Sequence, residues 1–132
     1  MKFFTIAELC KSTTADRLGI NNRCRQEHVT ALTALVDNVL DPLREWWGKP
    51  ITVNSGYRCP ELNAAVKGSK TSQHMVGEAA DIDTGDRQQN KLLFEYIRKN
   101  LPYDQLIDES NLAWVHVSYR ADGNNRMQIL KL

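Results

Sequence analysis

The chain has 132 residues and a mass of 15.1 kDa, which fits a single domain and leaves little room for a second. Lys plus Arg is 17 and Asp plus Glu is 16, so the net charge of +1 argues against a protein that binds nucleic acid or an anionic membrane through a basic excess. No apolar run approaches the roughly 20 residues needed to span a bilayer. We therefore expect one domain, 1–132, that binds neither nucleic acid nor membrane.

The first half of the chain is patterned mainly for helices. Thr5 followed by Glu8 is a capping-box pattern, which is typical of a helix start. Further along, apolar residues recur at steps of three and four, and Pro42 within that run should kink or restart the helix. The elements expected in this half are, in chain order, a helix over 6–11, a helix over 28–47, a strand over 51–54 and a helix over 61–66.

The second half alternates a polar loop, 69–78, with segments of strand and helix pattern. Asp86 with Gln89 opens a helix that Pro102 ends, and a strong turn signal lies at 122–124. The strands expected in this half are 79–83, 104–109, 113–119 and 127–130. Helices first and strands later predict an α+β domain, in which helices pack against an antiparallel sheet.

The three cysteines, Cys10, Cys24 and Cys59, are odd in number, far apart and without a C-x-x-C pair. This spacing argues against a disulfide framework or a cysteine zinc site, so we expect three reduced, packed thiols. Glu8 interrupts any hydrophobic leader at the N-terminus, which predicts a chain that is cytoplasmic as synthesised.

Two of the three histidines stand in patterns suited to a metal site. His74 and Asp81 lie on either side of Gly77, where a turn would let both side chains converge. Asp81 has an apolar setting that is costly for a lone carboxylate, and a cation would offset that cost. In a strand, His116 points away from the face of its two valine neighbours and is a reasonable third ligand. Spacing alone does not exclude that His74 and His116 have only a structural role. We expect His28 to be a solvated surface residue.

These residues belong to a longer pattern. The motif S-x-H-x-x-G-x-A-x-D over 72–81, followed by W-V-H over 114–116, resembles the zinc D-alanyl-D-alanine carboxypeptidase family. That family includes phage endolysins that cleave peptidoglycan, and it shares its fold with the hedgehog signalling domain. A second block, S-G-Y-R over 55–58 followed by Asn63, matches upstream. The resemblance covers nearly the whole chain and points to the short, single-domain phage and prophage-type members.

The resemblance implies a zinc peptidase that hydrolyses an amide bond in peptidoglycan stem peptides, as a D-Ala-D-Ala carboxypeptidase or as an endolysin-type endopeptidase. It makes His74, Asp81 and His116 the zinc ligands and leaves a fourth position open for water. Arg58 matches the family's arginine near the substrate, and its guanidinium suits a peptide carboxylate or carbonyl. Ser72 matches a hydroxyl that helps to hold the substrate end.

The general base departs from the pattern of several relatives, which place a glutamate three residues before the last histidine. Here that position is Ala113. Other members place the acid at the end of the preceding strand, where this chain has Asp108 and Glu109. We predict that Glu109 is the base, with Asp108 as the second choice and Glu78 as a third.

The choice between these two acids depends on the length of the hairpin loop. If the loop is even, such as 110–111, then Glu109 opposes Leu112 and lies on the same sheet face as His116, because opposed residues share a face. An odd loop would put Asp108 on that face instead.

Two interpretations of function remain. The first is the peptidase, acting as a monomer on a peptidoglycan peptide and reaching the cell wall through release by a holin or a similar route. The second is a zinc-containing binding module without turnover, as in the hedgehog domain, and Ala113 in place of the glutamate favours it.

Overall fold

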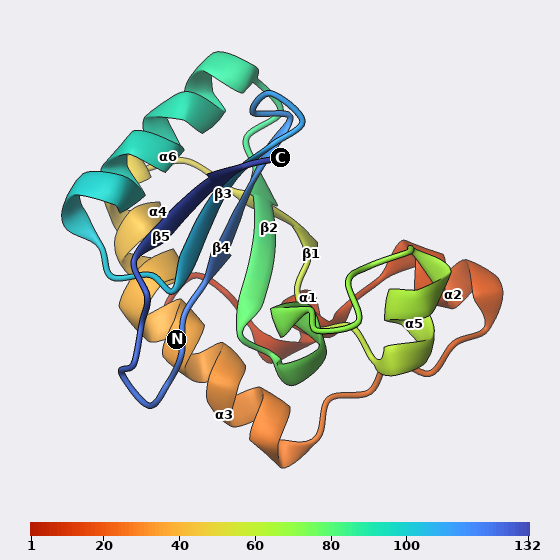
Figure 1. The fold of residues 1–132 in the computed structure, drawn as a ribbon. Coiled ribbons are helices and arrows are strands. Elements are labelled where there is room, and N and C mark those ends of the chain that lie inside the picture. The colour runs from red at the N-terminus through yellow and green to blue at the C-terminus, as the bar shows by residue number, and fades with distance from the viewer.

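A computed structural model describes residues 1–132. The helices are α1 (Ile6–Cys10), α2 (Thr13–Leu18), α3 (Gln26–Leu35), the π-helix η1 (Val36–Leu40), α4 (Asp41–Trp47), α5 (Pro60–Ala65), the 3₁₀ helix η2 (Gln73–Val76) and α6 (Arg87–Asn100). The strands are β1 (Thr52–Ser55), β2 (Ala79–Asp83), β3 (Gln105–Glu109), β4 (Trp114–Ser118) and β5 (Gln128–Lys131). Figure 1 shows α3, α4 and α6 gathered on one side of a single sheet, with α1, α2 and α5 near its β1 edge.

The predicted long helix is divided into three pieces. The chain runs as α3, η1 and α4, and Pro42 lies in the first turn of α4, where its missing N–H costs no hydrogen bond. The expected disturbance at Pro42 therefore takes the form of one π segment directly before it. Helix α2 was not predicted, although Ser12 caps its start and Gly19 ends it in a left-handed conformation, φ +69°.

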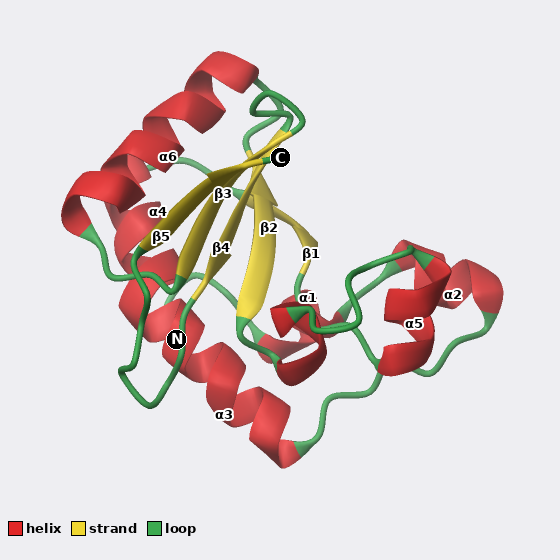
Figure 2. Cartoon of the chain, in the orientation of Figure 1, coloured by secondary structure: helices red, strands yellow, loops and turns green.

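The five strands form one sheet in the order β1-β2-β4-β3-β5 (Figure 2). The predicted α+β class is confirmed, because three of the strand pairs are antiparallel and helices cover the sheet. The expectation of an antiparallel sheet is wrong for the last strand, because β5 pairs with β3 in parallel. Both edges of β4 are already taken by β2 and β3, and β5 pairs at the outer edge of β3.

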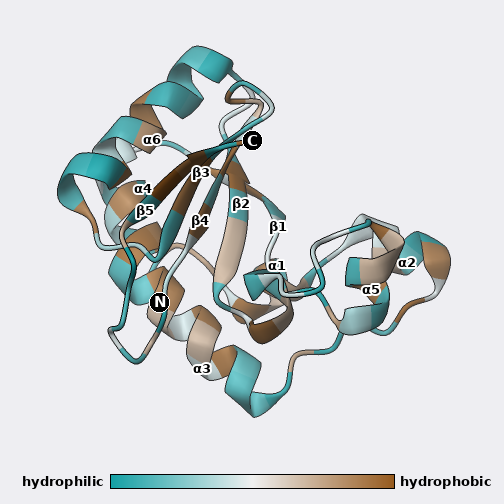
Figure 3. Ribbon diagram, in the orientation of Figure 1, coloured by the Kyte–Doolittle hydropathy of each residue, from teal (hydrophilic) through white to brown (hydrophobic).

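The two faces of the sheet differ in character. Apolar side chains of β2 and β4, including Ile82, Val115 and Val117, are fully buried against the helices, and Figure 3 shows brown on these strands. Asp81 and His116 alternate with them and therefore point to the opposite face. The core thus fixes the strands from one side and leaves the other face for polar chemistry. None of the helices is long and apolar enough to cross a bilayer.

Cys10 and Cys24 form a disulfide, with their Cα atoms 6.5 Å apart, and only Cys59 is a free thiol. The expectation of three reduced thiols is therefore wrong for this pair. Helix α2 lies within the 14-position loop between them and turns the chain back on itself, so the two cysteines meet. The spacing of the two cysteines in the sequence does not indicate this pairing, because the pairing depends on α2, which was not predicted.

The disulfide loop is attached to the segment that carries Arg58. The Asn22 side-chain amide donates to the carbonyl oxygens of Cys10 and Tyr57, both at 2.9 Å, and accepts from the Cys59 backbone N–H at 2.7 Å. One partly buried amide therefore joins three stretches of backbone, and two of its contacts flank Arg58.

Removing the disulfide by changing Cys10 and Cys24 to serine is expected to lower the free energy of unfolding by about 3 kcal/mol, because the unfolded chain gains the freedom of a loop of that length. Urea denaturation of the oxidised protein and the double variant measures the difference. Cys59→Ser is the matched control: its sulfur accepts from the Leu62 N–H at the start of α5, and serine can do the same. Equal stability of the native protein and the double variant would contradict the expectation.

Candidate active site

Three side chains meet on the open face of the sheet, as their spacing predicts. Asp81 on β2 and His116 on β4 are directly opposed, and their side chains share one face. The Asp81 Oδ1 atom lies 3.0 Å from His116 Nδ1 and 3.3 Å from His74 Nε2. One ligand atom from each of the three residues lies within 4.8 Å of the others. All three are at most 9% exposed, so they form a compact, desolvated donor set.

His74 reaches the sheet because η2 is capped at its start and ended by a left-handed glycine. Ser72 caps its start and accepts from the His74 backbone N–H at 3.2 Å. Gly77 ends it at φ +79°, and a Cβ atom there would lie 2.8 Å from the carbonyl oxygen of His28. Glycine is therefore required at position 77 both for its backbone conformation and for the close approach of α3.

A hydrogen bond from behind fixes the orientation of the His74 ring. Its Nδ1 lies 2.7 Å from the carbonyl oxygen of Gly56, so Nδ1–H donates to this carbonyl and Nε2 is left facing Asp81. A Cβ atom on Gly56 would overlap the carbonyl oxygen of Leu9. The S-G-Y-R block thus needs its glycine to bring this carbonyl under the imidazole.

The donor set fits a zinc ion. Burial opposes ionisation of Asp81, but hydrogen bonds from His116 and His74 outweigh it and hold the pKa of the carboxyl below its ordinary value. An ionised carboxylate and two imidazoles are ordinary zinc ligands, and three protein ligands leave one coordination position open, as in catalytic sites. His74, Asp81 and His116 would therefore hold the metal.

Arg58 lies beside this cluster and supports it. Its guanidinium donates to Asp81 Oδ2 at 3.3 Å, to Ser55 Oγ at 2.9 Å and to Asn63 Oδ1 at 3.3 Å. These bonds use three of its five N–H groups, so two remain for another acceptor. Arg58 also lines the cleft above the metal ligands.

A cleft of about 580 Å³ opens over the three ligands. Besides them and Arg58, its walls include Ser72, Glu109, Trp114 and Leu130. The predicted substrate-binding and catalytic side chains thus face one space, apart from Asp108 and Glu78, which do not line it.

Glu109 lies on the sheet face of His116, as the even-loop prediction requires. Its partner across the hairpin is Trp114, however, so the expected pairing with Leu112 is wrong. The turn spans 110–113, and three consecutive residues from Ser110 to Leu112 have left-handed backbones, φ 49°, 57° and 62°. This longer turn shifts the pairing by two positions, which preserves the face of every side chain.

The alternative acids are engaged elsewhere. Asp108 lies on the other sheet face and accepts from the Leu112 backbone N–H at 2.7 Å, so it holds the turn. Glu78 accepts from Gln73 Nε2 at 3.1 Å. Burial, together with the charge of Asp81, raises the pKa of Glu109 above its ordinary value, which is the direction that favours proton transfer near neutral pH.

An ion pair between a buried carboxylate and a half-exposed arginine, which sequence reasoning missed, borders the cleft. Asp104 is fully buried and accepts from Arg126 Nη2 at 2.7 Å and from Gln73 Nε2 at 2.9 Å. Gln73 directly precedes His74, so this pair connects the metal loop to the last strand. The Gln73 Oε1 atom is buried without a hydrogen-bond partner. The sequence gives no signal for this network, because Asp104 and Arg126 are 22 positions apart.

Lowering the pH from 5 to 2 is expected to remove about 2 kcal/mol of stability through Asp104. The hydrogen bond from Arg126 lowers the pKa of this carboxyl to about 2, against burial, which opposes it. A carboxyl with a lower pKa in the folded state stabilises the fold above its unfolded pKa, and this contribution disappears as the pH falls toward 2. Urea unfolding of the native protein and Asp104→Asn across this range measures it. Parallel pH curves for the two proteins would show that another group is responsible.

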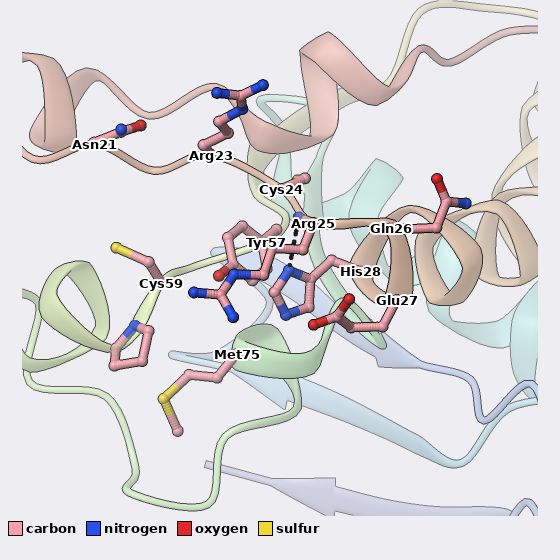
Figure 4. Close-up of a pocket in the computed structure, with 11 residues that line it drawn as sticks. Asn21, Arg23, Cys24, Arg25, Gln26, Glu27, His28, Tyr57, Cys59 and Met75 are labelled. Atoms are coloured by element: carbon pink, nitrogen blue, oxygen red, sulfur yellow. Dashed lines mark hydrogen bonds between the residues drawn. The ribbon is translucent and has the colours of Figure 1, made fainter.

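A second cavity, of about 790 Å³, contains none of the three ligands (Figure 4). His28 lines it, stacks on Tyr57 with ring centroids 4.2 Å apart and accepts from the Arg25 backbone N–H at 3.1 Å. His28 is therefore half-buried and packed, and the expectation of a solvated surface residue is wrong.

Residues 2–118 match the model of the family described as Peptidase M15. A zinc D-Ala-D-Ala carboxypeptidase of Streptomyces albus G is 38% identical to this chain over 76 residues. The match covers 50% of this chain and 30% of that protein, so the chain corresponds to less than a third of its relative's length.

Proposed function

This chain belongs to the peptidase M15 family, and from that premise we propose that it is a zinc peptidase that hydrolyses an amide bond in peptidoglycan stem peptides. The observation that carries the proposal is the cluster of His74, Asp81 and His116 beneath a cleft that is also lined by Arg58 and Glu109. The cluster supplies a metal position, and the two flanking side chains supply a substrate contact and a base.

Each group has a separate task in the proposed reaction. His74, Asp81 and His116 would hold a zinc ion, which would supply a Lewis acid for the scissile carbonyl and for water. The free N–H groups of Arg58 hold a carboxylate or carbonyl of the peptide, and the Ser72 hydroxyl donates to its end. Glu109 accepts a proton from the attacking water and returns it to the leaving amine nitrogen.

Two bonds are candidates for cleavage. The name of the Streptomyces relative supports the terminal D-Ala-D-Ala bond, as in a carboxypeptidase. An endolysin-type endopeptidase of phage origin, which would cut within the stem or cross-bridge, is the second candidate. The third alternative, a binding module without turnover, has the support of Ala113 at the family's glutamate position.

Digestion of purified peptidoglycan with the zinc-loaded protein, followed by mass spectrometry of the muropeptides, tests these alternatives. Loss of one terminal alanine identifies a carboxypeptidase, and new termini within the stem or cross-bridge identify an endopeptidase. Binding without any product supports the binding module and contradicts the peptidase. His116→Ala is the control for contaminating hydrolases.

We also propose that the protein acts outside the cytoplasm, where its substrate lies. The Cys10–Cys24 disulfide supports this, because disulfides persist mainly in oxidising compartments. Release after synthesis in the cytoplasm, by a holin or a similar route, would bring the chain to the wall. Labelling of free thiols in protein recovered from culture medium and from lysate tests the compartment: one free thiol per chain is expected outside the cell.

A further inference from the structure

The sheet order places a second arginine at the end of the cleft away from Arg58. Arg58 donates to Ser55 on β1 and to Asp81 on β2. Arg126 pairs with Asp104, which directly precedes β3, and itself lies two positions before β5. Because the order is β1-β2-β4-β3-β5, the ligands on β2 and β4 lie between the two arginines. Both arginines line the cleft.

The buried carboxylate of Asp104 fixes the orientation of the Arg126 guanidinium. Oδ1 of Asp104 accepts from the Arg126 backbone N–H at 2.9 Å and from Nε at 3.0 Å, while Oδ2 accepts from Nη2 at 2.7 Å. Gln73 holds Oδ2 from the other side. Asp104 is fully buried and Arg126 is 49% exposed, so the carboxylate lies beneath the guanidinium. Nη1 has no acceptor in the protein and is free to meet a group in the cleft.

The charge of the cleft wall favours an anionic substrate. Apart from the three metal ligands, the charged side chains that line it are three cations, Arg58, Lys67 and Arg126, and a single acid, Glu109. A ligand carboxylate at the β5 end would therefore meet the Arg126 guanidinium before the buried Asp104.

The family match does not account for this end of the cleft. It covers residues 2–118, whereas three residues that line the cleft lie beyond it: Arg126, Leu130 on β5 and Leu132 directly after β5.

Resting on the proposed function, we propose that Arg126 is a second substrate-binding arginine, which binds a carboxylate on the acyl side of the scissile amide. Arg58 takes the C-terminal carboxylate, which necessarily lies on the amine side. The preferred substrates are then acidic peptides that carry a carboxylate on each side of the bond that is cut. A fixed guanidinium suits this task, because two parallel N–H groups can bind one carboxylate.

The first test compares two isosteric peptides, acetyl-Glu-D-Ala-D-Ala and acetyl-Gln-D-Ala-D-Ala, with the zinc-loaded native protein. Their Kd values are measured by stopped-flow fluorescence of Trp114, which lines the cleft, and their hydrolysis is measured separately as kcat/KM. We expect the glutamate peptide to bind about tenfold more tightly, since a half-exposed charge-assisted contact is weaker than a buried one.

The second test changes the arginine while keeping a cation for Asp104. In Arg126→Lys an ammonium remains paired with the buried carboxylate, but the planar guanidinium that can present two parallel N–H groups to a second carboxylate is lost. The tenfold preference is expected to fall to about one- to twofold. Arg120→Lys is the matched control: Arg120 lies on the same connection, 3.8 Å from Asp122, and does not line the cleft. The Arg120→Lys variant is expected to keep a preference of about tenfold for the glutamate peptide over the glutamine peptide. Thermal melting of each variant verifies its fold.

The outcomes separate this inference from the proposed function. Three outcomes would overturn the role of Arg126. They are equal Kd values for the two peptides, no binding of either peptide, and an unchanged preference for the glutamate peptide in folded Arg126→Lys. Hydrolysis of both peptides with equal affinity leaves the peptidase standing without this subsite. A tenfold preference in binding that Arg126→Lys removes, without hydrolysis of either peptide, supports the subsite and contradicts the peptidase.

Discussion

Replacing Glu109 by glutamine is expected to lower the rate of peptide hydrolysis by a factor of about 10²–10⁴, while zinc and the fold are retained. Glu109 faces the cleft from the same side of the sheet as His116. Burial and the neighbouring Asp81 charge raise the pKa of its carboxyl, which makes it a stronger proton acceptor once ionised. Glutamine has nearly the same shape but cannot accept the proton. Steady-state kcat of the zinc-loaded proteins measures the loss.

Asp108→Asn is the matched control for this change. It removes the charge of the adjacent acid on the other sheet face, where the side chain holds the hairpin turn. We expect activity close to that of the native protein, because the amide oxygen can still accept from Leu112. Inactivation by Asp108→Asn with full activity in Glu109→Gln would reverse the assignment. If both variants stay active, the base lies elsewhere, with Glu78 next in line.

The change His116→Ala is expected to remove the bound zinc, about one ion per chain in the native protein, and to reduce hydrolysis to background. Two ligands remain, His74 and Asp81, which is fewer than catalytic zinc sites use. The same change removes the His116 imidazole as a donor to Asp81, so that carboxylate loses one of the two hydrogen bonds that keep it ionised. Elemental analysis after dialysis at low free zinc measures the occupancy, and circular dichroism verifies the fold.

His28→Ala is the control for the zinc experiment, since it removes a histidine that stacks on Tyr57 in the other cavity. It should keep one zinc per chain. Full occupancy in His116→Ala would show that His116 is not a ligand, and loss of zinc from both variants would point to a general effect on the fold.

Local patterns sufficed for most of the helices and strands. The β2 strand matches its predicted range, 79–83, because its alternation and flanking residues are local signals. The parallel position of β5 and the Cys10–Cys24 bond depend on which distant segments meet, and short-range periodicity carries no information on that. Helix α2 is a different case: Ser12 and Gly19 mark its ends, so its residues contained a usable signal.

More of the metal site than of the residues around it could be predicted from the sequence. Gly77 and the strand alternation around His116 made convergence of these side chains a reasonable expectation, and the family resemblance identified them as the ligand set. The face of Glu109 followed from parity, although the turn is two residues longer than expected, because a shift of two preserves the face. The Asp104–Arg126 pair could not be predicted, since it depends on β5 returning to the edge of β3.

The single disulfide beside a free thiol has a practical consequence for handling the protein. Thiol reductants that protect Cys59 would also attack the Cys10–Cys24 bond, and their thiolates compete with His74, Asp81 and His116 for zinc. A preparation kept in such a buffer would lose metal and a covalent cross-link together, and the two losses would look like one inactivation. Blocking Cys59 by alkylation, in buffer free of thiols and chelators, keeps them apart.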